Sequence, residues 1–163
     1  MAEKNPIRPT DDEARALAKD LLVKARYGAL AVLDKDTGAP YVSRVALALT
    51  PDGQPVTLIS ELSSHTGHLL ANPAASLLVG EPGDKGDPLT HPRMTLNCKA
   101  EFLRHGEPGR DALRDHYLSQ IPKAKLYIDF GDFLFAIFRV DSIALNGGFG
   151  KAFHLTPADL GLV

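Results

Sequence analysis

The sequence contains a single cysteine, Cys98, and no long apolar run. One cysteine cannot form an intramolecular disulfide or build a zinc site alone, so we expect the protein in a reducing compartment. Because no histidine stands beside it, Cys98 is predicted to be a buried strand residue rather than a catalytic thiol. The longest apolar run, residues 133–138, is about a third of the ~20 residues that a membrane-spanning helix needs. Residues 1–10 also lack the apolar stretch of a secretory signal, and both absences predict a cytoplasmic protein that does not cross a membrane.

The chain also has little excess charge of either sign. Its 18 basic and 20 acidic residues give a net charge of −2 and are spread along the whole sequence. No broad positive surface is expected for nucleic acid or acidic lipids, and neither is predicted as a partner. A length of 163 residues, 44% of them apolar, fits a single domain over residues 1–163 with one hydrophobic core.

Three segments have the pattern of helices. Thr10 and Glu13 fit a capping box at the start of the first, and apolar residues then recur at spacings of three and four until Gly28. Residues 63–72 predict a short second helix that a proline stops. Residues 109–120 present apolar side chains at helical spacing and predict a third helix.

Most of the remaining sequence consists of short segments with strand character. They cover residues 29–33, 41–49, 56–59, 75–80, 94–103, 133–145 and 151–155. Turn-forming aspartates and glycines separate the first three, which are predicted to form an antiparallel meander. Residues 1–10 are predicted to be flexible, and residues 81–92, rich in proline and glycine, to form an exposed loop. The pattern indicates a mainly β, α+β domain with a closed or partly open antiparallel barrel.

Three stretches, taken in order, resemble one family of flavoproteins. They read GAPYVSRV at residues 38–45, LISELSSHTGHLL at 58–70 and GGFGKAFHL at 147–155, with support from residues 73–78 and 94–102. The sequence resembles the FMN-binding split barrels of the pyridoxamine-phosphate oxidase superfamily, most closely their haem-utilisation, HugZ-like branch. The resemblance implies a six- to seven-stranded antiparallel split β-barrel with short flanking helices. It also implies a homodimer with one FMN in a groove at the interface.

The start of the second predicted helix is where the resemblance implies the FMN phosphate. A helix N-terminus offers unpaired backbone amides to a phosphate, and Ser63, Ser64 and Thr66 add hydroxyls there. The oxidase relatives carry an arginine-lysine pair where this chain has His65 and Thr66. We therefore expect Arg44 to supply the missing cation, because its planar fork matches phosphate oxygens. As alternatives, the hydroxyls would only cap the helix, and Arg44 would form a surface ion pair.

Further residues complete the predicted cofactor site. The glycine-rich segment 147–150 permits close backbone approach, with Phe149 against a flat ring and Lys151 beside a phosphate or a substrate carboxylate. A bulge or chain reversal is the alternative interpretation of that segment. No catalytic residue is assigned, because the flavin itself would carry the electrons. The full predicted set is Ser43, Arg44, Val45, Ser60, Ser63, Ser64, His65, Thr66, Phe149 and Lys151.

His65 and His68 stand three residues apart on one helix and raise the question of a metal. Two ligands do not make a metal site, and a third would have to come from a distant residue such as His91 or His154. The spacing does not predict that these residues converge, so no metal site is predicted. One of the two helix histidines is expected to donate a hydrogen bond to the cofactor or to cap the helix.

Three functions are compatible with the resemblance. The first, which we favour, is an FMN-dependent oxidoreductase acting on an unidentified small substrate. The second is haem binding or degradation, although the HugZ-like proteins hold haem through a histidine beyond the GGFG segment, where His154 is the late candidate. The third is a non-catalytic flavin-binding module. Pyridoxamine-phosphate oxidase activity itself is not expected, because the segment that closes that enzyme's substrate site has no counterpart here.

Overall fold

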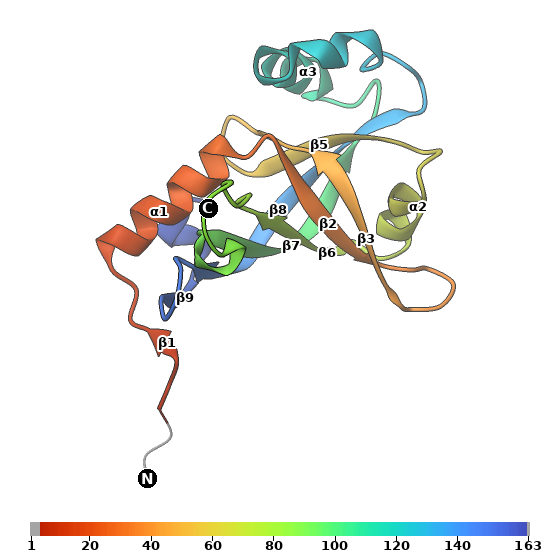
Figure 1. Ribbon diagram of the computed structural model, residues 1–163. Helices are drawn as coiled ribbons and strands as arrows, with labels where there is room; N and C mark the ends of the chain where they lie inside the picture. Colours follow the sequence, from red (N-terminus) through yellow and green to blue (C-terminus); the bar gives the residue numbers. More distant parts are fainter. Residues whose placement is uncertain (1–3, 163) are drawn as a thin grey trace.

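The computed structural model describes residues 4–162 of the chain. Its helices are α1 (Asp12–Lys24), α2 (Ser64–Ala71) and α3 (Arg110–Gln120), with three short 3-10 helices, η1 (Pro88–Thr90), η2 (Pro122–Leu126) and η3 (Pro157–Leu160). Its strands are β1 (Ile7–Arg8), β2 (Tyr27–Leu33), β3 (Pro40–Ala46), β4 (Ala48–Leu49), β5 (Pro55–Ser60), β6 (Ala74–Val79), β7 (Arg93–Leu103), β8 (Phe133–Asn146) and β9 (Ala152–Leu155). Figure 1 shows the strands curved into a barrel, with α1 and α2 on different sides and α3 beyond the strand ends.

The nine strands of residues 4–162 form one sheet in the order β1-β9-β8-β7-β6-β2-β3, with β5 joined to β8 and β4 joined to β5. All neighbouring strands are antiparallel except β1 and β9, which run parallel. The prediction of an α+β, antiparallel split barrel is therefore confirmed. Beyond the seven predicted strands, the structure adds β1, whose two residues are too few to produce an alternating pattern, and it divides the predicted strand 41–49 into β3 and β4.

The predicted antiparallel meander of residues 29–33, 41–49 and 56–59 is confirmed, but its middle strand is divided in two. β2 pairs with β3, and β4, the end of the predicted strand 41–49, pairs with β5, while β3 itself does not pair with β5. The sheet therefore stays open between β3 and β5. We call this opening the seam, bordered by residues 44–46 of β3 and residues 58–60 of β5. A sequence pattern identifies strands but not their partners, because pairing over long separations depends on the whole barrel.

Two groups of buried side chains hold the fold together. The larger fills the barrel, where the buried residues of α1 (Ala14, Ala18 and Leu22) recur every fourth position and pack against the strands. The smaller joins α3 to β5 and β8, and includes Tyr117 and Phe135. This smaller cluster attaches α3 and the segment after it to β5, which borders the seam, and to β8.

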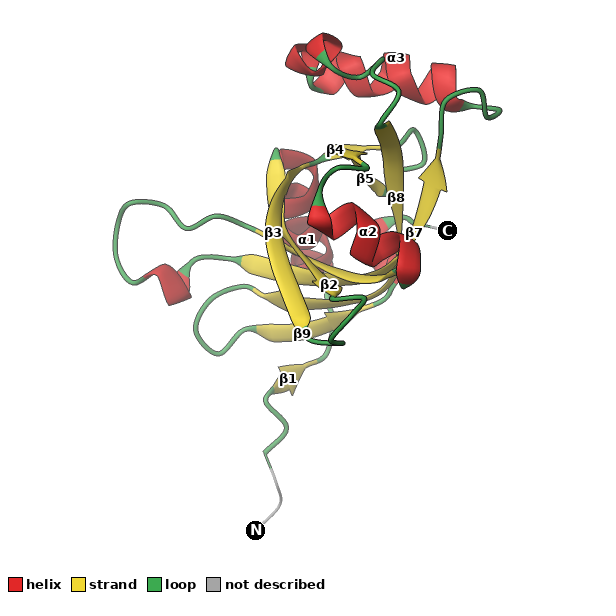
Figure 2. Cartoon of the chain, turned by 90° about the vertical axis from the view of Figure 1, so that its right-hand side faces the viewer, coloured by secondary structure: helices red, strands yellow, loops and turns green. Residues whose placement is uncertain are grey.

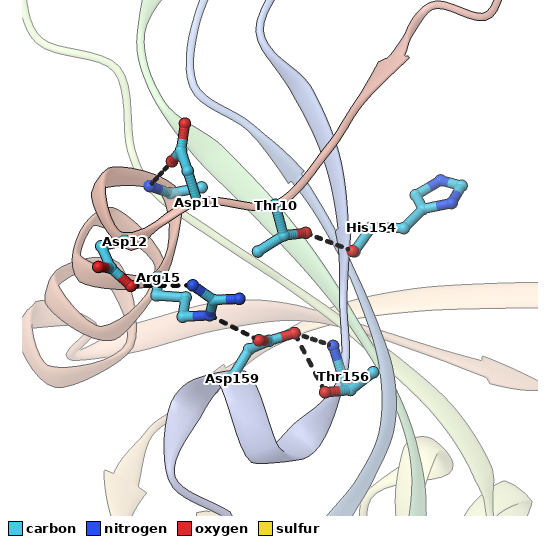
Figure 3. A network of polar contacts seen from close by, with 8 residues as sticks. Thr10, Asp11, Asp12, Arg15, His154, Thr156 and Asp159 are labelled. Atoms are coloured by element: carbon cyan, nitrogen blue, oxygen red, sulfur yellow. Dashed lines mark hydrogen bonds and ion pairs between the residues drawn. The ribbon is translucent and has the colours of Figure 1, made fainter.

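The start of α1 differs from the predicted capping box. Asp11 caps the helix, because its carboxylate accepts a hydrogen bond from the Ala14 amide at 2.8 Å. The hydroxyl of Thr10 donates instead to the carbonyl of His154 at 3.0 Å (Figure 3). The Arg15 Nε donates to Asp159 at 2.8 Å, and both contacts tie the start of α1 to the C-terminal part of the chain. The capping box was wrong because a tertiary contact engages Thr10.

The end of α1 was also predicted too late. The helix ends at Lys24, and Gly28 lies inside β2. A Cβ atom at residue 28 would be 2.8 Å from Leu47 Cδ1 and 3.1 Å from the Leu78 carbonyl oxygen. Glycine is therefore required here by close packing in the barrel, and not by a helix stop.

The two segments predicted to lack regular structure both contain some. Within the segment 1–10, for which flexibility is predicted, Ile7 and Arg8 pair with Ala152 and Phe153 of β9, while residues 1–3 lie outside the described residues. Residues 81–90 are exposed and include η1. Across residues 4–162, no helix has the length and apolar character to span a membrane.

Candidate functional site

A cavity of about 270 Å³ lies at the seam. Residues of β3 and β5, the start of α2, and two aromatic side chains that follow α3 surround it. Figure 2 shows α2 across one end of the barrel, next to β2 and β3. The lining residues are Arg44, Val45, Ala46, Leu58, Ile59, Ser60, Ser63, His65, Tyr127 and Phe133.

The open seam leaves backbone groups free for a ligand. Within residues 4–162, strand β3 pairs only with β2 and ends the sheet path, and residues 58–60 of β5 pair only with β8. About half of the amides and carbonyls of such edges point away from the paired neighbour. The two edges can therefore offer hydrogen bonds to a planar group that lies between them.

A compact set of hydrogen bonds sets the turn from β5 into α2. The carbonyl of Ser60 accepts from the Ser63 amide at 3.0 Å and from the Thr66 hydroxyl at 2.6 Å. The Ser60 hydroxyl donates to Asp132 at 2.5 Å and accepts from the Leu62 amide at 3.1 Å. Thr66 is fully buried, so its hydroxyl supports the turn and does not face the cavity.

The hydroxyls of Ser63 and Ser64 are placed differently. Ser63 occupies the cap position of α2 with extended backbone, but its side chain makes no capping hydrogen bond. It lines the cavity, so its hydroxyl is free to meet a ligand there. Ser64 is exposed and is not among the lining residues. Capping by side-chain hydroxyls, the alternative interpretation of these residues, does not occur at Ser63.

His65 lies half-buried in the cavity wall. Its Nδ1 is 3.0 Å from the Ser43 hydroxyl, which fixes the orientation of the ring. Burial lowers the pKa of His65, and the charge of nearby His68 lowers it further. The imidazole is therefore neutral near pH 7, and its Nε2 makes no hydrogen bond to residues 4–162.

His68 has a structural role and is not part of the cavity. It is buried, and its Nδ1 accepts a hydrogen bond from the Lys35 amide at 3.0 Å. Its Nε2 lies 3.7 Å from Asp34, and its ring centre is 5.0 Å from that of Tyr41. These contacts hold α2 against the β2–β3 turn, so the two helix histidines serve different partners.

Arg44 lies at the edge of the cavity. It is exposed, and its guanidinium carbon is 5.5 Å from the centre of the Tyr27 ring. Among residues 4–162, no carboxylate forms an ion pair with Arg44, so the fold does not support the alternative interpretation of Arg44 as half of a surface ion pair. A guanidinium that stacks on an aromatic ring keeps its hydrogen-bond donors available to an anion.

An aromatic wall was missing from the predicted site. Tyr127 and Phe133 line the cavity with ring centres 5.1 Å apart, and Phe130 lies 6.3 Å from Phe133. Ala46, Leu58 and Ile59 were also missed. The last two belong to a stretch that carries the family resemblance, but the aromatic residues follow α3 at no regular spacing, so only the fold brings them to the seam.

Two predicted site residues lie far from this cavity. Phe149 and Lys151 follow the end of β8, whereas Phe133 begins it. A strand of 14 residues extends roughly 45 Å if straight. Phe149 is 92% exposed and Lys151 is also exposed. Within one chain, therefore, neither residue joins the cavity at the seam.

Comparison with known proteins identifies the fold and its relatives. The family model described as pyridoxamine 5'-phosphate oxidase matches residues 12–145. The chloroplastic heme oxygenase HOZ of Arabidopsis thaliana is 38% identical over 120 residues, which is 73% of this chain and 35% of that protein. The chain thus spans about a third of this curated relative.

Solved structures with a similar fold include proteins named for heme binding. A heme binding protein from Mycobacterium smegmatis superposes with a TM-score of 0.81 at 31% identity, over 95% of this chain and 61% of that one. ChuZ from Campylobacter jejuni has a TM-score of 0.81 at 20% identity, over 93% and 63% of the two chains, which shows a shared fold. The chain belongs to the pyridoxamine 5'-phosphate oxidase family and is similar to the HugZ-like members of that superfamily.

Proposed function

We propose that the protein binds FMN at the seam and acts as an FMN-dependent oxidoreductase on a small substrate. One observation carries the proposal: a single cavity combines the start of α2, an arginine and an aromatic wall between two unpaired strand edges. These are the features that a phosphate with an attached flat, hydrogen-bonding ring requires. Membership of the family supports the choice of FMN.

The phosphate would bind at the start of α2. The Ser63 hydroxyl is free of intramolecular capping bonds, and Ser63 and His65, at the start of the helix, line the cavity. The first amides of a helix lack intrahelical partners and favour an anion. Arg44 would supply the positive charge that the oxidase relatives obtain from an arginine-lysine pair. Its lack of a carboxylate partner supports this role, because an anion would not have to displace an existing ion pair.

The ring would lie along the seam. Tyr127 and Phe133 would pack against one part of it, and the free amides and carbonyls of β3 and β5 would bond its polar edge. The flavin, when bound, supplies the electron-accepting and electron-donating chemistry. The chain would orient the ring and restrict which substrates approach, and a cytoplasmic location would supply the FMN.

A second copy of the chain would complete the site. Ligand pockets commonly measure ~300–1,000 Å³, so a cavity of about 270 Å³ would leave part of the flavin outside. Leu62 and Leu126, next in sequence to lining residues, are 89% and 80% exposed and would be covered by a partner. Phe149 and Lys151 could then reach the cofactor from that partner. These observations support a homodimer with the cofactor at its interface.

The test is titration of the purified protein with FMN, followed by flavin fluorescence. Arg44→Ala and Ser63→Ala should each weaken binding by about 10- to 150-fold, because a charge-assisted hydrogen bond contributes about 1.5–3 kcal/mol. Arg26→Ala and Ser119→Ala are the controls, since both residues are exposed and lie outside the cavity lining. Equal affinities in all four variants would refute the proposed site.

Turnover is tested separately from binding. The bound flavin should be reduced by a reduced nicotinamide nucleotide or by dithionite and should then pass its electrons to an added acceptor at a rate above that of free FMN. Tight binding without any such gain would reduce the proposal to a flavin-binding module.

Haem binding is the second candidate, and His65 is the observation that favours it. A neutral imidazole with one nitrogen oriented by Ser43 and the other unbonded is a suitable iron ligand. The similarity to proteins named for heme supports the same candidate. Haemin titration should produce a sharp Soret band that His65→Ala abolishes and His154→Ala leaves intact. Loss with the second variant alone would move the ligand to β9.

A further inference from the structure

Arg110, the first residue of α3, is a buried cation with an unusual set of partners. It is 2% exposed, and its Nη2 donates to the Ile128 carbonyl at 2.7 Å. The guanidinium carbon lies 5.2 Å from the centre of the Phe135 ring, and Nε is buried without a partner. Burial lowers the pKa of the guanidinium. The nearby Asp129 carboxylate is paired with Arg114 instead.

A buried arginine at residue 110 lowers the stability of the fold unless its guanidinium makes a contact that the fold requires. Burying a charge without a carboxylate partner carries a desolvation cost, and an apolar residue of similar length would avoid it. What an apolar residue cannot do is donate to the Ile128 carbonyl. A planar guanidinium makes that bond while its face lies on Phe135. The role of Arg110 is therefore to bind the segment that contains Ile128.

The segment in question is residues 127–132, which connects η2 to β8. Contacts from the α3 side hold it at several points. Besides the bond from Arg110, the His105 Nε2 lies 2.8 Å from the Phe130 carbonyl. Arg114 makes two hydrogen bonds with the Asp129 carboxylate, at 2.6 and 2.5 Å. On the opposite side, the Glu61 amide donates to the Asp132 carbonyl at 2.8 Å.

The 127–132 segment carries the aromatic wall of the cavity. Tyr127 directly precedes the residue that Arg110 holds, and Phe133 directly follows the segment. Both rings line the cavity. Tyr117 of α3 adds to this arrangement, because it belongs to the buried cluster against which Tyr127 and Phe133 pack. Of the contacts that fix the segment, the Arg110 bond is the buried one, and water competes least for it.

We propose that Arg110 is a positioning residue of the cavity, whose bond to the Ile128 carbonyl holds Tyr127 and Phe133 in the geometry that receives the ring of the ligand. The inference rests on the proposed function for the identity of that ring, a flavin. Arg110 touches neither the cavity nor the ligand and acts through the 127–132 segment. Loss of the bond lets the segment move and displaces the aromatic wall.

Two substitutions separate this role from simple stabilisation of α3. Arg110→Met keeps an apolar chain of similar length over Phe135 but has no donor, whereas Arg110→Lys retains one donor for the Ile128 carbonyl. Arg139→Met is the matched control, because Arg139 is a partly exposed arginine that pairs with Glu101 and Asp52 away from the segment. Each variant is examined by limited trypsin digestion and by FMN titration.

Trypsin cleaves after Lys123 and Lys125, two exposed residues of η2 immediately before the segment. Arg110→Met should increase cleavage there, weaken FMN binding by about tenfold and reduce the quenching of bound flavin by the aromatic wall. Arg110→Lys should restore part of each property. A lowered melting temperature with unchanged cleavage, FMN affinity and quenching would overturn the proposal. If Arg110→Met does not fold, the proposal is tested with Arg110→Lys by the same three measurements: intermediate cleavage, affinity and quenching support it, and values equal to those of the unsubstituted protein overturn it.

The cleavage result keeps this test separate from the proposed function. If the unsubstituted protein does not bind FMN, the proposed function fails. The role of Arg110 in positioning the segment is still supported if cleavage increases in Arg110→Met and partly recovers in Arg110→Lys. That role is overturned if Arg110→Met is cleaved no more than Arg139→Met.

Discussion

Replacement of Gly80 by alanine should be one of the most damaging single substitutions in this chain. Gly80 directly follows β6 and has a φ angle of +100°. An added Cβ would lie 2.6 Å from the Pro92 carbonyl oxygen and 2.7 Å from the Arg93 Cα. Both are backbone atoms, so no flexible side chain can move aside. A strained backbone costs about 1–3 kcal/mol and overpacking about 1–3 kcal/mol more, so the expected loss is about 2–6 kcal/mol.

Urea unfolding measures this loss, and Gly86→Ala is the control. Gly86 also has a positive φ angle, +78°, but an added Cβ would meet no atom within 4 Å. Gly86→Ala should lower the free energy of unfolding only by the cost of placing alanine at a positive φ angle, about 1–2 kcal/mol. With a slope of about 2 kcal/mol per M, Gly80→Ala should lower the unfolding midpoint by about 1–3 M. Equal losses in the two variants would refute the argument, because they would mean that the predicted contact is relieved without cost.

Two further predictions follow from groups that burial affects. Because the pKa of His65 is lowered below its ordinary value of 6.5, the folded protein binds fewer protons at this residue than the unfolded chain. The contribution of His65 to stability should be complete above pH 6.5 and decrease as the pH falls through the pKa of the folded state. His65→Gln should therefore flatten the dependence of the urea midpoint on pH, whereas the exposed His154→Gln should not. Identical profiles for the two variants would contradict this. Burial raises the pKa of Cys98 to about 12, and the residue is 4% exposed. A thiol reagent should therefore react with one cysteine per chain in denaturant but very slowly in the native protein, and rapid native reaction would show that the barrel wall opens at β7.

Much of the fold could be predicted because its signals are local. The alternation of residues 94–103 and the apolar spacing in α1 report which side of each element is buried, independently of distant partners. The ends of α1 could not be predicted, because Thr10 bonds to His154 and Gly28 packs against Leu47, and both partners are distant in the sequence.

The candidate site was predictable where it depends on one turn. Ser60, Ser63 and His65 lie within six residues and line the cavity because the turn into α2 holds them there. Tyr127 and Phe133 reach the same cavity from residues much later in the chain, through α3 and the bond from Arg110. Phe149 and Lys151 illustrate the opposite case, since the length of β8 keeps them, within one chain, away from the cavity near which the family resemblance places them.

The sequence by itself determined the class of fold, the family and the turn that begins α2, since each follows from local spacing, glycine and serine positions, and ordered motifs. Only the tertiary structure decided that β3 and β5 do not pair with each other, that His65 is oriented by Ser43 while His68 is buried elsewhere, and that aromatic side chains line the cavity. The physical reason is that these features depend on contacts between residues far apart in the chain. Such contacts form only when the whole barrel packs, and no local pattern encodes them.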